Sequence, residues 1–187
     1  GNKKILYANS SAGIGFLSDI FSRQQTLVFR LMKSICGSFA YAIASFLRLA
    51  IASGYKANIK IDNQAIKEQI QMLVIRKTKM TGPVSLVPFA KPDSGQLNAA
   101  LFGHTNVFNR FKIAMMMLMK NKPIENEAVQ YFGDTSSLDN AIASSSKITI
   151  ESEEQMPFDL NGEFIGYAPC DFELESAQLN VLYRVGK

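Results

Sequence analysis

The chain has 187 residues, of which 47% are apolar and 19% are charged, so it can bury a core and is not a disordered polypeptide. This length predicts a single domain spanning residues 1–187. The two cysteines, Cys36 and Cys170, lack metal-ligand spacing, which argues against a zinc site or a disulfide framework and favours a reduced, cytoplasmic setting.

The net charge of +4 is distributed unevenly along the chain. Residues 1–93 contain 13 Lys and Arg against 4 Asp and Glu, a net charge of +9, whereas residues 94–187 contain 7 against 12, a net charge of −5. A basic half suggests an anionic partner such as nucleotide phosphates, nucleic acid or a lipid surface. The basic half is equally explained as a solvent-exposed face of the fold. Nucleic acid is the weaker alternative, because the basic residues form no stripe interleaved with aromatics.

The first residues, Gly1-Asn2-Lys3-Lys4, run directly into a strand that we expect over residues 4–9. We interpret this start as that of an excised fragment, with a further domain expected upstream. A turn of small residues is predicted over 10–16. Within it, Gly13-Ile14-Gly15 is part of a glycine-rich loop, but the third glycine and the distant acid of a dinucleotide site are missing.

A long helical segment is predicted over residues 26–52, because apolar residues recur there at spacings of three and four. Gly37 and Ser38 are expected to divide or kink it. Arg48 lies well inside the apolar stretch, where membrane insertion would cost ~2.5–3.5 kcal/mol. A buried or interfacial helix is therefore preferred to a transmembrane one.

The remainder is predicted to be mainly strands, which makes the fold class α+β with two helical segments. A helix is expected over residues 106–120, with an apolar side that either packs on a sheet or offers a soft, Met-rich surface to an apolar ligand. That side comprises Phe108, Phe111, Met115, Leu118 and Met119. Strands are expected at residues 58–61, 70–76, 97–102, 147–151 and 179–184, with a turn at Asp62-Asn63.

Asn161-Gly162 lies between two strand-like segments and predicts a β-hairpin, because a type I′ turn needs positive φ at both central residues. The turn would present Glu163, with Asp159 nearby, at the tip of the ribbon. By sequence alone it is either a structural turn or part of a site. His104 has no partner identifiable by spacing and is interpreted as a cap or surface residue.

Five segments, in this order, resemble motifs of the diacylglycerol kinase/sphingosine kinase-type lipid kinases, particularly the soluble bacterial ones. They are distributed over most of the length of the chain. They are the strand and glycine turn over 7–16, the glycine-to-tyrosine helical motif over 37–41, the Asp-bearing loop over 88–97, the Asp-Gly-Glu-like hairpin over 158–163 and the closing strand over 177–182.

This resemblance implies that the chain is the β-rich, sandwich-like C-terminal lobe of a NAD kinase/diacylglycerol kinase-like fold, with two helical inserts. The nucleotide-binding lobe and its Gly-Gly-Asp-Gly-Thr motif are absent from this chain. The implied function is the substrate side of ATP-dependent phosphorylation of a diacylglycerol-like lipid hydroxyl, with ATP and Mg²⁺ as cofactors. The alternative is a non-catalytic lobe, derived from such a kinase, that binds a lipid or a protein.

The same resemblance assigns catalytic positions to Asn161, Glu163 and Asp159, and a metal ligand to Asp93. In the family, the Asp of Asp-Gly-Glu accepts the proton of the lipid hydroxyl and the Glu lies at the phosphoryl-transfer site. Here Asn161 occupies the base position, and an amide cannot accept a proton at neutral pH. Ser94 replaces the second Asp of the metal loop. Asp159, two positions before Asn161, is the alternative base.

The partners implied by the resemblance are an upstream nucleotide-binding lobe and a lipid substrate at a membrane surface. A homodimer is left open, and no nucleic acid is expected. The expected location is the cytoplasm, with peripheral association at the inner membrane face as a further expectation. The fragment alone is expected to lack kinase activity.

Overall fold

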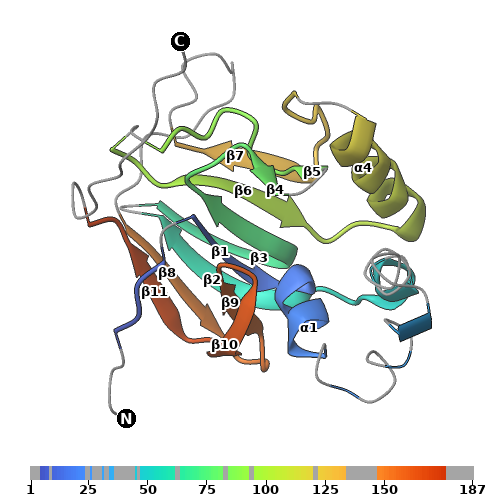
Figure 1. Ribbon diagram of the computed structural model, residues 1–187, viewed down its shortest axis with the longest axis horizontal. Coiled ribbons are helices and arrows are strands. Elements are labelled where there is room, and N and C mark those ends of the chain that lie inside the picture. Colours follow the sequence, from blue (N-terminus) through green and yellow to red (C-terminus); the bar gives the residue numbers. More distant parts are fainter. Residues whose placement is uncertain are drawn as a thin grey trace.

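The computed structural model describes residues 5–8, 10–23, 26, 31, 34–35, 45, 47–61, 64–81, 84–92, 95–119, 122–133 and 147–175 (Figure 1). Its labelled helices are α1 (Phe16–Ser22) and α4 (Val107–Met119), and residues 47–51 are helical as well. Its strands are β1 (Ser11–Gly15), β2 (Tyr55–Ile61), β3 (Gln64–Arg76), β4 (Met80–Thr81), β5 (Val84–Ser85), β6 (Asn98–Gly103), β7 (Val129–Phe132), β8 (Lys147–Ser152), β9 (Pro157–Leu160), β10 (Glu163–Tyr167) and β11 (Cys170–Glu173).

Among the described residues, the main sheet has nine strands and is organised around β3, the longest of them. Ile70 of β3 pairs with both Tyr55 of β2 and Gly103 of β6, so β2 and β6 lie on opposite edges of β3. β1 pairs with residues 72–76 of β3, beyond the stretch that β2 occupies. The sheet therefore divides along one edge of β3 into two branches, β1–β9–β10 and β2–β8–β11.

The two branches curl toward each other and enclose the first of two cores. Phe158 of β9 and Phe172 of β11 meet across this core in an edge-to-face contact with ring centroids 6.4 Å apart. Residues of both branches and of β3 and β6 fill it, among them Ile14, Ile59, Leu73, Leu101, Ile148 and Met156. The curvature brings the end strands of a branched antiparallel sheet close together, so the sheet is nearly closed.

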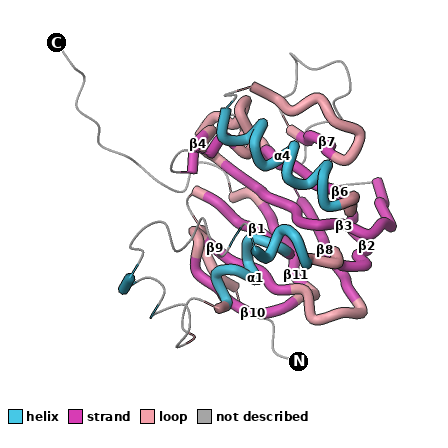
Figure 2. The backbone as a smooth tube through the Cα atoms, turned by 90° about the vertical axis from the view of Figure 1, so that its right-hand side faces the viewer, coloured by secondary structure: helices cyan, strands magenta, loops and turns pink. Residues whose placement is uncertain are grey.

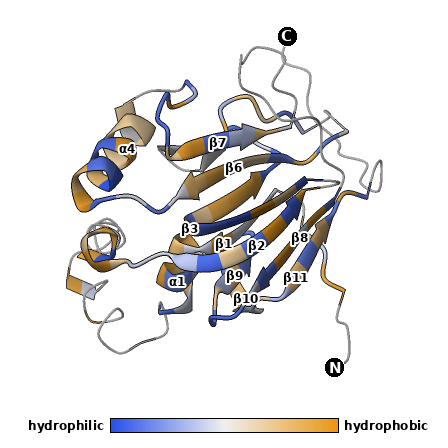
Figure 3. Ribbon diagram, turned by 180° about the vertical axis from the view of Figure 1, so that it is seen from behind, coloured by the Kyte–Doolittle hydropathy of each residue, from blue (hydrophilic) through white to orange (hydrophobic). Residues whose placement is uncertain are grey.

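The second core lies on the opposite face of β3 and β6, which α1 and α4 cover (Figure 2). Met72 and Val74 of β3 point into it, whereas Leu73 and Ile75 point into the first core. β3 is consequently buried without interruption over its last seven residues. Strands with one exposed face instead alternate, as β8 does between hydrophobic and hydrophilic residues (Figure 3).

Most of the predicted strands are confirmed, together with the hairpin and the helix near residue 107, so the domain is mainly β-sheet with few helices. The prediction for the first residues is wrong. Residues 5–8 form no regular strand, and the expected turn over 10–16 is β1 followed by the start of α1. Small residues form a strand here because β1 pairs on both edges, with β3 and β9.

The apolar side predicted for α4 is wrong at three of its positions. Phe108, Met115 and Met119 are 87%, 53% and 76% exposed, whereas Ile113 and Met117 face the second core. The interior side of α4 includes a charged residue, Arg110, which masked this periodicity in the sequence.

The predicted helical segment over residues 26–52 falls mostly outside the described residues, as do the motif over 37–41, the turn at 62–63 and the strand at 179–184. Residues 47–51 are described and are helical. Cys170 is a free cysteine, and burial raises the pKa of its thiol to about 12, so it remains protonated at neutral pH.

Arg110 connects α4 to the helical residues 47–51. Its side chain is only 9% exposed. Its Nε donates to the Thr105 carbonyl (2.8 Å), and its Nη1 donates to the Leu49 carbonyl (2.9 Å) and to the Ala52 carbonyl. A guanidinium therefore satisfies carbonyl groups at the end of one helix from the interior side of another.

We expect Arg110→Met to lower the free energy of unfolding by about 1.5–3 kcal/mol, because carbonyls that now accept hydrogen bonds from a charged group lose their donor. Urea unfolding measures the change. The matched control is Lys112→Met on the exposed side of α4, for which we expect a change below ~0.5 kcal/mol. Equal losses in both variants would contradict this role of Arg110.

Candidate functional site

The hairpin formed by β9 and β10 turns at Asn161-Gly162, as predicted. φ is 53° at Asn161 and 82° at Gly162, which is the positive-φ pair of a type I′ turn. Glu163 pairs with Leu160, and Phe164 pairs with Asp159. A bulge between Phe164 and Gly166 then shifts the register. The turn chemistry was readable from the sequence because it depends on two adjacent residues.

Asn161 ties the turn to the start of β1. Its Oδ1 accepts hydrogen bonds from Ser10 Oγ (2.9 Å), Ser10 N (3.3 Å) and Ser11 N (3.3 Å), and its own backbone N–H donates to the Ser11 carbonyl (2.8 Å). The acceptor oxygen makes all three side-chain contacts. A carboxylate oxygen could accept the same bonds, so the turn does not by itself require an amide at this position.

Asp159 is buried beneath the hairpin, with 4% of its surface exposed. Ser18 Oγ of α1 donates to Asp159 Oδ1 at 2.6 Å, and the Gly162 backbone N–H donates to Oδ2 at 3.2 Å. Burial raises the pKa of Asp159 above its usual range, although both hydrogen bonds and the charge of Arg76 act to lower it. The carboxyl group therefore fixes the turn from within.

Gly13 of β1 lies directly opposite Asp159 in the sheet. A Cβ at position 13 would sit 2.6 Å from Asp159 Oδ1, closer than any side chain tolerates. The glycine-rich segment therefore serves close approach between β1 and a buried carboxylate. This explains the glycine without a nucleotide loop, in agreement with the missing motif residues.

Glu163 is exposed at the first position of β10. Directly opposed residues of an antiparallel pair share one face, so Glu163 projects on the side of Leu160 and Asp159 on the side of Phe164. The structure thus brings the three predicted positions into one turn but sends the two carboxylates to opposite faces of the ribbon. They do not form a shared ligand pair.

Two residues near the hairpin, Ser18 and Arg76, were not predicted from the sequence. Ser18 is separated from Asp159 by 141 residues, and Arg76 influences the pKa of Asp159 from β3. Arg76 is 7% exposed, and burial lowers its pKa while the negative charge of Asp159 raises it. Neither residue has a spacing or motif that could have identified it.

The predicted metal ligand Asp93 and the neighbouring Ser94 lie outside the described residues. In the part of the chain that is described, no three His, Cys, Asp or Glu side chains are grouped so as to hold a metal ion. His104 is exposed, as expected, and borders a shallow hollow with Glu68 and Glu127. This polar, acidic hollow contains none of the predicted site residues.

A helix long and apolar enough to cross a bilayer does not occur among the described residues. No protein-family model matches the chain. Over 142 residues, however, it is 26% identical to a diacylglycerol kinase from Staphylococcus carnosus and 28% identical to one from Staphylococcus haemolyticus. These matches cover 75% of this chain but only 42% and 39% of the two relatives.

Solved structures of proteins assigned as diacylglycerol kinases are also similar to this chain in fold. A Bacillus anthracis protein assigned as a diacylglycerol kinase matches with a TM-score of 0.60 at 20% identity, over 89% of this chain and 50% of that one. A second such protein from this organism gives 0.55 at 15% identity, over 88% and 49%. The chain thus spans about half the length of these relatives or less. In sequence and in fold it is similar to the diacylglycerol kinases, which confirms the family resemblance that the ordered motifs predicted.

Proposed function

We propose that this chain forms the substrate side of an ATP-dependent lipid kinase that phosphorylates the hydroxyl of a diacylglycerol-like lipid. The proposal is supported by the similarity to diacylglycerol kinases and carried by one observation on the chain itself. The hairpin that resembles the Asp-Gly-Glu motif of the family has a two-residue turn, is anchored to β1 through Asn161, and leaves the Glu163 carboxylate exposed. A NAD kinase-like arrangement with an upstream nucleotide lobe is part of the proposal.

As a catalytic site, this hairpin is least complete in the group that would accept the hydroxyl proton. Asn161 is an amide, and losing a general base typically costs on the order of 10²–10⁴-fold in rate. Asp159 has the right chemistry and a raised pKa, but Ser18 and Gly162 occupy its oxygens and it is 4% exposed. Direct proton transfer needs a contact of about 2.6–3.2 Å. In this conformation Asp159 positions the turn.

The described residues do not offer the carboxylate set that Mg²⁺ prefers, because Asp159 and Glu163 project on opposite faces of the hairpin. In the proposed protein, ATP and Mg²⁺ would be held chiefly by the nucleotide lobe, and Asp93 stays a proposed ligand. Glu163 is the exposed carboxylate of the hairpin.

The exposed side of α4 supports the proposal that the substrate is a lipid. Phe108, Met115 and Met119 follow one another at seven- and four-residue spacings and are exposed, while the opposite side of α4 packs on the sheet. Methionine side chains adapt to irregular apolar surfaces such as acyl chains. We propose that this side of α4 contacts the acyl part of the lipid at a membrane surface.

We expect Asn161→Asp in the intact protein to raise kcat by up to about 10²-fold, because it supplies a carboxylate where the hydroxyl loses its proton. The turn should survive, since the new carboxylate can accept the hydrogen bonds of Ser10 and Ser11. Transfer of labelled phosphate from ATP to diacylglycerol measures the effect. Glu163→Gln in the same background should lower activity.

If Asn161→Asp leaves turnover unchanged while Asp159→Asn abolishes it, the base is Asp159. If wild type and all three variants are inactive, the alternative of a non-catalytic lipid- or protein-binding lobe replaces the proposal.

A second prediction concerns the ionisation of Asp159. Because burial holds its pKa above that of the unfolded chain, the folded state binds this proton more tightly, and stability is lost as pH rises from about 4 through the folded-state pKa. Urea unfolding of wild type and Asp159→Asn between pH 4 and 7 should show the wild type losing stability relative to the variant. Asp171→Asn, at an exposed position, serves as the matched control. A constant difference would contradict the raised pKa.

For the acyl contact, we expect Phe108→Ser combined with Met119→Ser to raise KM for long-chain diacylglycerol several-fold more than for a short-chain analogue. Folding should be unaffected, since both side chains are exposed. Steady-state kinetics with the two substrates provide the measurement. An equal change for both chain lengths would rule out this side of α4 as an acyl contact.

A further inference from the structure

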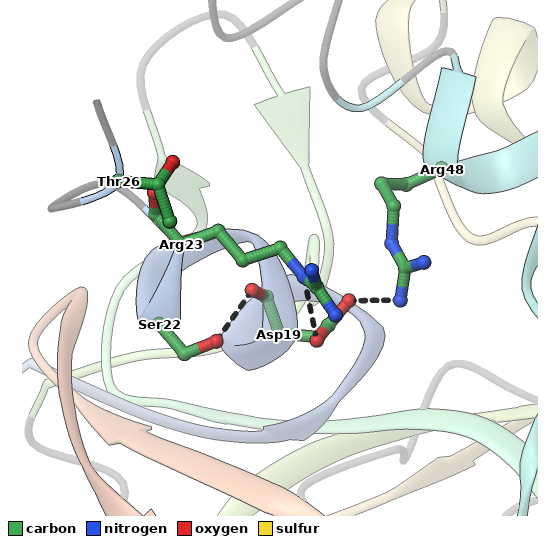
Figure 4. Close-up of polar contacts among 5 residues, drawn as sticks. All are labelled: Asp19, Ser22, Arg23, Thr26 and Arg48. Carbon is green, nitrogen blue, oxygen red and sulfur yellow. Dashed lines mark hydrogen bonds and ion pairs between the residues drawn. The ribbon is translucent and has the colours of Figure 1, made fainter. Parts of the chain in front are cut away.

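A second polar cluster is centred on Asp19 of α1. Asp19 follows Ser18, the residue of α1 that contacts Asp159 beneath the hairpin. Asp19 is 8% exposed, and its two carboxylate oxygens bind two arginines (Figure 4). Arg23 Nε donates to Oδ1 at 3.1 Å, and Arg48 Nη2 donates to Oδ2. The two guanidinium groups, from the end of α1 and from the helical residues 47–51, are therefore held on one carboxylate.

This cluster has more positive charge than its acid can balance. One carboxylate faces two guanidinium groups, which leaves a formal excess of +1. A guanidinium carries five N–H donors. Within the described part of the chain, Arg23 and Arg48 each use one nitrogen, that toward Asp19, and the buried Nε of Arg48 has no partner. The side chains of Arg23 and Arg48 are 55% and 30% exposed, so both guanidinium groups can be reached from solvent, although the Nε of Arg48 is buried.

Tyr55, at the start of β2, belongs to the same electrostatic neighbourhood. Its pKa is raised, first by burial and then by the charge of Asp19, while Arg48 and Arg23 act in the opposite direction and Glu154 adds a small increase. The phenol group therefore stays protonated at neutral pH and can donate a hydrogen bond.

A purely structural ion pair does not account for this arrangement. One arginine would neutralise Asp19 and connect α1 to residues 47–51. The second brings an additional charge, and a buried N–H group without an acceptor costs free energy. An anion bound to both guanidinium groups would balance the charge.

We propose that Arg23 and Arg48, oriented by Asp19, form a binding site for a phosphate group. The planar guanidinium fork matches phosphate oxygens in a bidentate manner, and two such forks fixed on one carboxylate are organised before the ligand arrives. The phosphate belongs either to a lipid headgroup or to a free ion. The site does not depend on the phosphoryl-transfer role of the hairpin.

Titration of the chain with sodium phosphate at constant ionic strength, followed by the backbone amide resonances of α1 and residues 47–55, tests the site. We expect saturable shifts there, with affinity reduced at least tenfold in Arg23→Gln and in Arg48→Gln. Lys67→Gln removes one charge from an exposed position of β3 and should bind phosphate like the wild type. Since Arg23 is more than half exposed, Arg23→Gln should fold, which a thermal unfolding scan verifies.

A second arm identifies the source of the phosphate. Sedimentation with phosphatidylcholine vesicles is compared with and without phosphatidic acid. Binding to phosphatidic acid vesicles that is lost in both arginine variants supports the site and assigns it to a lipid headgroup. Binding of free phosphate alone supports it as an ion site. Absence of both, or equal loss in Lys67→Gln, overturns the proposal, whatever the activity of the hairpin variants.

Discussion

Burial of β3 on both faces is the constraint on which the rest of the fold depends. Its last seven residues are buried without interruption, and successive side chains enter two different cores. Such a strand requires a covering layer on each side. The two curled branches of the sheet supply one layer, and α1 and α4 supply the other (Figure 2). Each fully buried Leu or Ile contributes about 1.5–3 kcal/mol, so this strand concentrates much of the apolar stabilisation.

The short helix α1 links the hairpin to the interior. Ser18 reaches Asp159 beneath the turn, and its neighbour Asp19 reaches Arg48 instead. Phe16 and Ile20 of the same helix enter the second core. One helix of seven residues thus positions both polar clusters. The proposed catalytic turn and the proposed phosphate site therefore both depend on α1.

The buried carboxylates of the two clusters, Asp159 and Asp19, have different electrostatic surroundings. Asp159 is surrounded by neutral donors and by the more distant charge of Arg76, so desolvation prevails and its pKa rises. Asp19 contacts two arginines directly, and the cluster retains positive charge. The first arrangement suits a structural or proton-holding carboxyl group. The second suits binding of an anion, since its donors exceed its acceptors.

Local sequence determined the parts of this protein that depend on adjacent residues. Asn161-Gly162 predicted the hairpin because positive φ is a property of those two residues, and most strands followed from alternation. The ordered motifs also predicted the family resemblance. Only the tertiary structure decided that the small residues of β1 form a strand paired on both edges, that Arg110 faces inward on α4, and that Ser18 and Arg76 influence Asp159. These outcomes depend on contacts between residues far apart in the chain, which no local pattern encodes.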